Sequence, residues 1–290
     1  MNDRMLNHVT EDMNSSPYGI EPYENLTISN SFMFSKVMSD PENCKGFLER
    51  AFPDLDIGEV VPVPESTHQV APGLKGIRLD VYAKDGRHLF DVECQTTDKK
   101  NLPKRSRYYN SMLDMDQLDS GKNYHELKPV YIIFICTFKL DYGNGHRYTF
   151  RRYCEEDPDL ALSDGTEIIF YSTKGTENDI SGPMQKFLKY MDGEPGAGDG
   201  DDYIRKLDAS VRYARTRPEW RKEYMDLQML IKEERAEAEA EAAQAKTEAA
   251  QAKARVTKII QNMLAANYED ETILNITGIT KEQLEEIRKK

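Results

Sequence analysis

Near the N-terminus, hydrophobic residues recur at the spacing of helices. Residues 30–38 place apolar side chains three and four positions apart, and Asn30 or Ser31 can cap this segment. A second helix is expected to begin at Pro41, with Asp40 as its cap. The chain therefore begins its ordered part with two short helices.

Two strands joined by a tight turn are predicted next. Residues 76–83 and 88–95 alternate between apolar and polar positions, and Asp85-Gly86 lies between them. Because Asp-Gly favours a two-residue turn, Asp80 is expected to face Asp91. In the same register Arg78 faces Glu93. The opposite, core-facing side is expected to hold Leu79, Val81, Ala83, Phe90, Val92 and Cys94.

Helices and strands alternate over the following hundred residues. Residues 103–119 have helical spacing, and residues 130–138 form an unbroken apolar, β-branched and aromatic run typical of a central buried strand. A short strand is expected at 167–172, followed by helices at 181–191 and 203–216. The pattern predicts an α/β fold, with a mixed sheet of about four strands flanked by helices.

The composition changes after residue 228. Residues 229–256 are almost wholly Ala, Glu, Gln, Lys and Arg, which predicts a long C-terminal helix. At 1.5 Å per residue this helix would span roughly 42 Å. Its alanine seam favours a solvated spacer over a strong coiled coil. The predicted parts are a flexible arm at 1–24, a domain at 25–228, the spacer, and a small helical module at 257–290.

The last module consists of short helices. Gly278 should end a helix at 270–276, and Thr280 with Gln283 should form a capping box for the final helix. This pair of helices is similar to a helix-turn-helix. The final helix, 281–290, carries both signs of charge. A packing or oligomerisation module and a DNA-reading module both fit this pattern.

Composition narrows the class of protein. The 290 residues carry 39 Lys+Arg and 51 Asp+Glu, a formal net charge of −12. No stretch approaches the roughly 20 apolar residues of a membrane span, and the first residues lack the apolar core of a signal peptide. The four cysteines lie among apolar or aromatic neighbours and show no CxxC spacing, which predicts small core residues in a reducing, cytoplasmic location. Since the chain is acidic, a nucleic-acid site must be a local basic patch.

Acidic side chains gather on one face of the predicted hairpin. Asp80, Asp91 and Glu93 share this face with Gln95 and Arg78. Three crowded carboxylates repel one another unless a cation lies among them, and carboxylate and amide oxygens suit a hard ion such as Mg²⁺ or Mn²⁺. A solvated hairpin face with an Arg78–Glu93 ion pair would give the same pattern.

A basic patch follows the acidic strand directly. It consists of Lys99, Lys100, Lys104, Arg105 and Arg107, with no acidic residue among them. Carboxylates for a metal ion beside cations for phosphate are what phosphodiester hydrolysis needs. We therefore expect DNA as the partner, with these five residues binding its backbone.

These segments, in this order, resemble the PD-(D/E)XK nuclease superfamily and, within it, the transposase-like, recombination-promoting nuclease family of bacteria. The resemblance covers about residues 25–230. It is carried by an opening helix, two catalytic strand segments, a following helix, a third strand and a helical ending, at residues 32–38, 78–81, 91–95, 102–109, 130–136 and 273–278.

The resemblance implies a restriction-endonuclease-like fold and a Mg²⁺- or Mn²⁺-dependent DNA endonuclease acting in recombination, transposition-like mobility or defence. Asp80 and Glu93 would bind the metal ion. Gln95, in the usual lysine position, would orient the attacking water, and Lys104, Arg105 or a metal ion would supply the missing charge. Asp91 is a candidate outer-shell ligand.

Ser31 departs from the resemblance, since relatives often carry an acid there. The alternative to an endonuclease is a DNA-binding or assembly protein that keeps the nuclease fold with weak or no cleavage. The acidic net charge and the neutral Gln95 favour this alternative. A scaffold protein acting through its long helix is a third interpretation. A homo-oligomer that forms through the C-terminal helices is expected, because three short helices bury too little surface alone.

Overall fold

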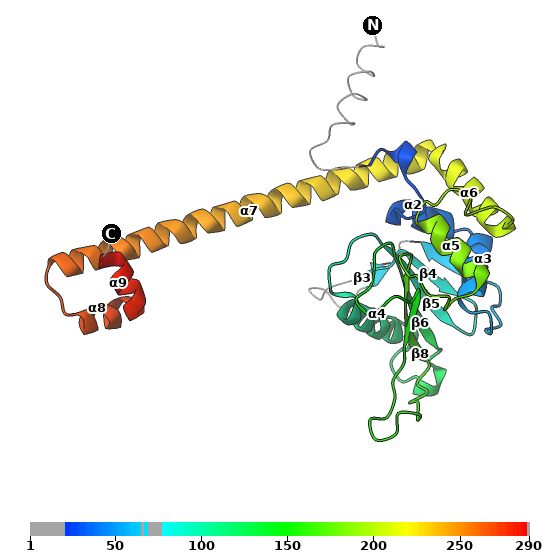
Figure 1. The fold of residues 1–290 in the computed structure, drawn as a ribbon, viewed down its shortest axis with the longest axis horizontal. Coiled ribbons are helices and arrows are strands. Elements are labelled where there is room, and N and C mark those ends of the chain that lie inside the picture. The colour runs from blue at the N-terminus through cyan, green and yellow to red at the C-terminus, as the bar shows by residue number, and fades with distance from the viewer. Residues whose placement is uncertain (1–20, 65–66, 69–76, 289–290) are drawn as a thin grey trace, which may run out of the picture. The chain divides into compact units, whose positions relative to one another are not determined.

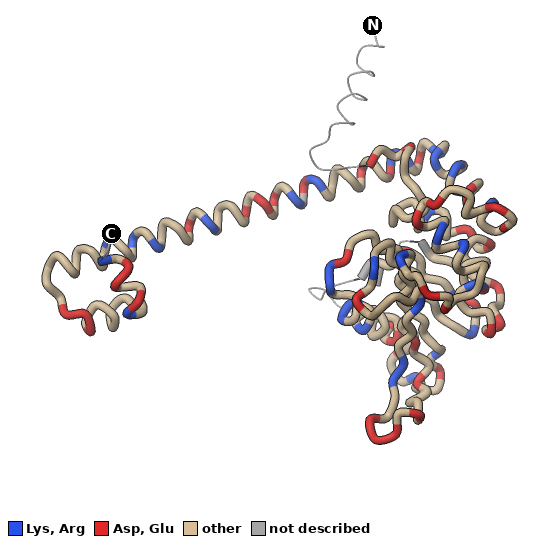
Figure 2. Tube along the Cα trace, viewed as in Figure 1, with Lys and Arg blue, Asp and Glu red and all other residues tan. Residues whose placement is uncertain are grey.

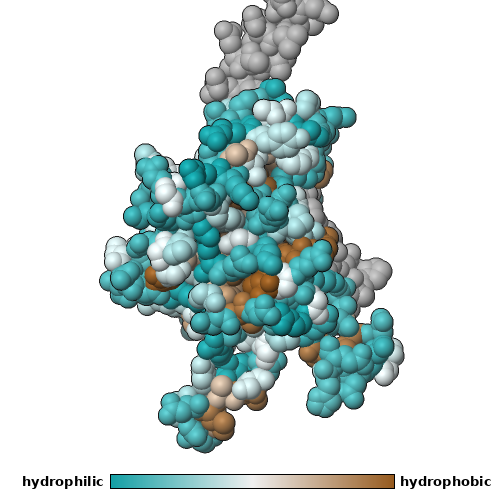
Figure 3. Space-filling view, turned by 90° about the vertical axis from the view of Figure 1, so that its right-hand side faces the viewer, coloured by the Kyte–Doolittle hydropathy of each residue, from teal (hydrophilic) through white to brown (hydrophobic). Residues whose placement is uncertain are grey.

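The computed structural model describes residues 21–64, 67–68 and 77–288. The chain divides into two compact units, Met1–Tyr224 and Met225–Lys290. In the described part of the chain, no helix combines the length and the apolar character that a membrane span needs. On the face drawn in Figure 3, hydrophilic residues predominate and hydrophobic side chains form small separate areas.

A mixed sheet forms the centre of the first unit (Figure 1). Its six strands lie in the order β1-β4-β5-β6-β8-β7. They are β1 (Val61–Pro64), β4 (Val81–Lys84), β5 (Leu89–Gln95), β6 (Val130–Cys136), β7 (Arg147–Phe150) and β8 (Thr166–Ser172). The strands β5, β6 and β8 run parallel, and the other neighbours are antiparallel. A separate antiparallel pair consists of β2 (Thr67–His68) and β3 (Ile77–Arg78).

The α/β fold with a mixed sheet and flanking helices is confirmed, although the sheet has six strands where about four were expected. The unpredicted edge strand β7 has only half-buried and exposed residues, so its sequence lacks the apolar run of a central strand. By contrast, β6 is predicted almost to the residue, because parallel neighbours on both sides bury both of its faces.

Helices cover both faces of the sheet (Figure 1). One face carries α4 (Leu102–Gln117), whose Leu113 packs with Ile132 and Phe134 of β6. The other face is covered by α2 (Ser31–Met38), α3 (Pro41–Ala51), α5 (Gly182–Met191) and α6 (Asp202–Arg215). The sheet therefore has a buried core on each side.

Local signals set the ends of the first two helices. Asn30, and not Ser31, caps α2 by accepting from the N–H groups of Phe32 and Met33. Asp40 caps α3, and Pro41 follows it as predicted. The predicted arm at 1–24 lies mostly outside the described residues. Its residue Tyr23 is buried and donates a hydrogen bond to the carbonyl of Ala214.

The register of the β4–β5 hairpin differs from the prediction by two residues. Val81 pairs with Val92 and Lys84 with Leu89, so residues 85–88 form a four-residue loop. The cause is Asp85, whose carboxylate accepts from the backbone N–H groups of Arg87 and His88 and keeps them in the loop. Because a shift of two residues preserves the side-chain alternation, the acidic residues of β5 keep a common face.

The predicted strand at 76–83 is interrupted at Leu79–Asp80, where the chain bends. Arg78 of β3 pairs with Thr67 of β2 and therefore does not face Glu93, contrary to the prediction. After the bend, the alternation of side chains between the two faces of the sheet starts again. As a result, Leu79 packs in the cluster under α4, on the side opposite to the one predicted.

All four cysteines are free. Cys44, Cys94 and Cys136 are buried, as expected of small core residues. The expectation is wrong for Cys154, which is half-exposed and whose Sγ donates to Glu156.

The second unit contains most of α7 (Pro218–Ala265), a continuous helix of 48 residues. The predicted spacer at 229–256 lies within it, and almost all of its described side chains are exposed. The helices α8 (Asp270–Thr277) and α9 (Lys281–Arg288) follow. Ile260, Ile273 and Leu284 form the buried core of this small helical module.

The predicted helix ends in this module are confirmed. Gly278 ends α8 in the left-handed conformation, with φ 67°. The N–H of Gln283 donates to Thr280 Oγ1, and the N–H of Thr280 donates to Gln283 Oε1, at 3.3 and 2.9 Å. These reciprocal bonds are the expected capping box.

Candidate active site

Two carboxylates meet where the chain bends before β4. Asp80 lies in the bend, and Glu93 lies across from it on β5. The backbone N–H of Asp80 donates to Glu93 Oε1 at 3.0 Å, and the N–H of Cys94 donates to Asp80 Oδ2 at 3.1 Å. Each carboxyl group thus accepts a hydrogen bond from the backbone of the opposite segment. These bonds keep both groups at one crossing of the chain, the point where Asp80 faces Glu93 and Cys94.

Arg105 reaches this crossing from α4. Its guanidinium forms an ion pair with Glu93, donates to Gln95 Oε1 at 2.8 Å and donates to Tyr109 Oη at 2.7 Å. It also lies over the rings of Tyr109 and Phe134, 4.9 and 5.1 Å from their centroids. The Arg105 side chain is only 24% exposed. Arg105 is therefore part of the carboxylate cluster, although the sequence pattern assigns it to the basic patch.

The sequence contains a signal for this inward position. Leu102, Tyr109 and Met112 are buried residues of α4, and Arg105 occurs at helical spacing from each of them. A basic residue on the apolar face of a helix needs a buried partner. Glu93 and Gln95 are those partners.

The amide of Gln95 is held at both ends. Its Oε1 accepts from Arg105, and its Nε2 donates to the carbonyl of Cys94 at 3.0 Å. An amide oxygen has a second lone pair and an amide nitrogen a second hydrogen. Gln95 can therefore bind one further small group, such as a water molecule, while Arg105 fixes its orientation.

Asp91 lies on the same face of β5 and is fully buried. Neither of its carboxylate oxygens accepts a hydrogen bond from a donor among the described residues. Burial first, and then the neighbouring charges of Glu93 and Asp80, raise its pKa well above the usual value. The raised pKa favours the protonated, uncharged form of Asp91, which can act as a hydrogen-bond donor towards Glu93.

Burial also raises the pKa of Glu93, to about 8, and the negative charge of Asp80 adds to this effect. The positive charge of Arg105 and the N–H of Asp80 act in the opposite direction. The short Arg105–Glu93 contact favours an ionised carboxylate, whereas the raised pKa favours a proton. We take desolvation as the larger effect, since Glu93 is wholly inaccessible to solvent.

An open cleft of about 470 Å³ leads to these residues. Its lining includes Asp80, Gln95 and Lys99, together with Ser29 and Ser31 from the start of α2. Glu93 is buried beside this lining. Ser31 lines the cleft and does not cap α2. The position at which the resemblance leads us to expect an acid therefore faces the same space as Asp80.

The predicted basic patch is divided by the structure. Lys99, Lys104 and Arg107 are exposed, and Figure 2 shows basic residues around α4. Lys100 is exposed but forms ion pairs with Asp98 and Asp141. Arg105 turns inward, as described above. Three of the five predicted cations are thus exposed, and Lys99 also lines the cleft.

Among the described residues, no three His, Cys, Asp or Glu side chains are grouped so that they could hold a metal ion by themselves. Mg²⁺ keeps several water ligands and is commonly held by one or two carboxylates with substrate phosphate. Two converging carboxylates, Asp80 and Glu93, are therefore a donor set that fits such an ion.

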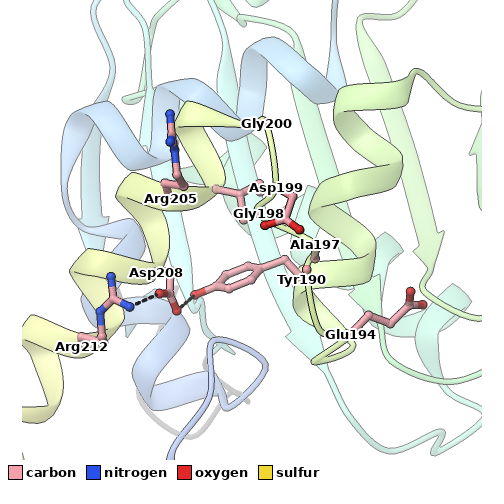
Figure 4. A pocket seen from close by; sticks show the side chains of 11 residues that line it. Tyr190, Glu194, Ala197, Gly198, Asp199, Gly200, Arg205, Asp208 and Arg212 are labelled. Carbon is pink, nitrogen blue, oxygen red and sulfur yellow. Dashed lines mark hydrogen bonds and ion pairs between the residues drawn. The ribbon is translucent and has the colours of Figure 1, made fainter.

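A second hollow, of about 520 Å³, lies between α5 and α6 (Figure 4). Tyr190 donates to Asp208 at 3.3 Å, and Arg212 forms an ion pair with the same carboxylate at 2.8 Å. The charges of Asp208 and Arg212 thus compensate each other. The cluster of carboxyl groups with raised pKa values lies at the other cleft, and we place the candidate site there.

A family of known proteins, described as PD-(D/E)XK nuclease family transposase, matches residues 29–181. The match covers slightly more than half of the chain and includes Asp80, Glu93, Gln95 and Arg105. No curated protein matches the chain.

Without added metal, the free energy of unfolding should fall as the pH rises from about 5 to about 8. Burial raises the folded-state pKa of Glu93 from 4.5 to about 8, so between these values the folded state keeps a proton that the unfolded state has released. This contribution is complete below the lower value and is lost as the pH passes the upper one. Urea denaturation in EDTA at pH 5, 6.5 and 8 measures the slope.

Glu93→Gln should reduce this slope, because the amide does not titrate, whereas Asp91, whose pKa is also raised, keeps a contribution. The exposed Glu59→Gln is the matched control and should keep the wild-type slope. Equal slopes for wild type and Glu93→Gln would show that another group causes the pH dependence.

Proposed function

The chain belongs to the PD-(D/E)XK nuclease family transposases, and from this membership we propose that it is a metal-dependent endonuclease that hydrolyses phosphodiester bonds of DNA. Membership supports a nuclease-type function. The observation that carries the finer proposal is the convergence of Asp80 and Glu93 at one crossing, with Gln95 and Arg105 beside them.

Each residue of the cluster has a role in this proposal. Asp80 and Glu93 would hold Mg²⁺ or Mn²⁺. Such an ion supplies positive charge to the phosphate and lowers the pKa of a bound water. The second lone pair of Gln95 Oε1 accepts a hydrogen bond from the attacking water and orients it. In its protonated form Asp91 would donate a hydrogen bond to Glu93 and fix that carboxylate without direct contact to an ion.

The charge missing at Gln95 would come from Arg105. Its guanidinium is 2.8 Å from the Gln95 amide oxygen, whereas Lys104, at the preceding position of α4, is exposed to solvent. A positive charge close to the reacting phosphate stabilises the negative charge that develops in the transition state. Lys99, Lys104 and Arg107 would hold the DNA backbone outside the cleft, with Lys100 as a weaker contributor.

Recombination, transposition-like mobility or defence are the roles we propose for such an activity, in the reducing environment of the cytoplasm, where four free cysteines are stable. One observation favours the alternative of a DNA-binding or assembly protein with weak cleavage. Glu93 is fully buried and already paired with Arg105, so it is not freely offered to an ion.

Plasmid nicking tests the proposal. Wild-type protein should nick supercoiled DNA with Mg²⁺ or Mn²⁺ and not with EDTA. Asp80→Asn should lower the rate by about 100-fold or more, because it removes a charge from the proposed ion site. The exposed Asp54→Asn is the matched control and should leave the rate unchanged. Nicking that persists in EDTA, or in Asp80→Asn, would contradict the assignment.

DNA affinity should depend on the exposed cations without regard to sequence. Lys104→Ala should weaken binding equally for unrelated duplexes and reduce the slope of log K against log salt by about one unit. Lys189→Ala removes an exposed lysine of α5, on the other side of the sheet, and should change neither quantity. Fluorescence anisotropy over a salt series measures both. Identical slopes for the two variants would make Lys104 ordinary surface charge.

We further propose that the small helical module joins two copies of the chain. Its buried core comprises Ile260, Ile273 and Leu284, and beside it Ile259 and Ile276 are 52% and 64% exposed. So small a core contributes little stability by itself. A second copy that covers the exposed isoleucines would bury additional apolar surface.

Ile276→Glu in the full chain should lower the oligomeric state measured by light scattering, because a charge replaces an apolar contact. Leu162→Glu, at a leucine that is also 64% exposed but lies in the first unit, is the matched control and should keep the wild-type mass. A variant that stays oligomeric while losing DNA affinity would support the DNA-reading alternative for this module instead.

A further inference from the structure

We propose that Arg105 is an internal counter-ion for the ionised form of Glu93, and that a divalent ion displaces Arg105 from this carboxylate when it binds. The inference rests on the proposed function, since it concerns the ion that the nuclease would use. It assigns to Arg105 a role that differs from DNA binding. The arginine holds the acidic cluster together without metal, and it gives up Glu93 but keeps its bond to Gln95 when a metal ion binds.

The first support is the way in which Glu93 is occupied. One of its oxygens accepts from the N–H of Asp80, and the other is paired with Arg105. The side chain has no exposed surface. Each oxygen keeps a further lone pair, so an ion that contacts this buried carboxylate directly must either share it with these partners or displace one of them.

The second support is electrostatic. The Asp80 N–H belongs to the backbone at the bend and carries only a partial charge, whereas the guanidinium carries a full positive charge. A divalent ion and a guanidinium on the same carboxylate repel each other strongly in a buried site. Arg105 is therefore the partner that a metal ion displaces from Glu93. The loss of this ion pair lowers the affinity for the metal ion.

The third support is that Arg105 has other partners at hand. It already donates to Gln95 Oε1 and Tyr109 Oη and lies against the rings of Tyr109 and Phe134. None of these contacts requires the charge of Glu93. The guanidinium can therefore stay beside Gln95, which lines the cleft, when Glu93 turns to an ion.

The inference predicts opposite effects of one substitution on two measurements. Neutral variants, Arg105→Met and Arg105→Gln, should bind Mn²⁺ about tenfold more tightly or better, because the competing charge is gone. The same variants should lose DNA cleavage. A residue with only a structural role would weaken both, and a residue that only contacts DNA would leave the affinity for metal unchanged.

Isothermal titration of the full chain with MnCl₂ at pH 8.5, without DNA, measures the affinity, and circular dichroism checks the fold. Lys104→Met, which removes the adjacent exposed cation, should keep the wild-type affinity. The glutamine variant keeps a hydrogen-bond donor for Glu93, and so remains a test if the methionine variant does not fold.

Unchanged or weaker Mn²⁺ binding by a folded neutral variant would overturn the proposal, as would a wild type and variants that bind no Mn²⁺. Tighter binding by the variants supports it. If this gain is found while wild-type protein nicks no plasmid, the counter-ion role stands and the endonuclease assignment fails.

Discussion

The placement of three carboxyl groups beneath one helix is the constraint on which the rest of the site depends. Asp80, Asp91 and Glu93 share one side of the sheet, and two of them have no exposed surface. Such a group is stable only if protons or cations reduce its charge. The raised pKa of Asp91 favours its neutral form, and Arg105 supplies a cation. The packing of α4 over the sheet brings this cation to Glu93.

The fold meets the requirement with few special features. β5 lies between antiparallel β4 and parallel β6, and the helices cover both faces of the sheet, so its acidic face is removed from water. The bend at Asp80 directs one backbone N–H towards Glu93. The apolar stripe of α4 carries Arg105 onto the same crossing, where aromatic rings surround its guanidinium. A hairpin with a solvated face, the simplest interpretation of the sequence, would need none of these features.

The same interactions connect the stability of the domain to its proposed chemistry. Without metal, the charge of the carboxyl groups is reduced by Arg105 and by a proton. A metal ion must therefore compete with Arg105 for Glu93. Gln95 is bound by the same guanidinium, so its orientation depends on Arg105 as well. A neutral amide in the usual lysine position is therefore compatible with catalysis when a charge from another element stands next to it.

The sequence by itself determined the features that depend on neighbouring residues. Helix ends at Asp40, Gly278 and Thr280 follow from local hydrogen bonds, and the strand at Val130–Cys136 follows from its unbroken apolar run. The common face of Asp91 and Glu93 follows from the two-residue period of a strand. The resemblance carried by these segments led to the family that the match over residues 29–181 shows.

Only the tertiary structure decided which groups meet. The four-residue loop at Asp85 moved the register by two, and pairing with β2 ended the strand at the bend, so Asp80 came to face Glu93 instead of Asp91. The edge strand β7 forms because β8 offers it backbone partners, not because of its own pattern. In the sequence Arg105 is one of several neighbouring basic residues and is therefore predicted to be a surface charge. In the structure it turns inward, because the packing of α4 places it next to Glu93. These outcomes depend on contacts between distant segments, which local spacing does not encode.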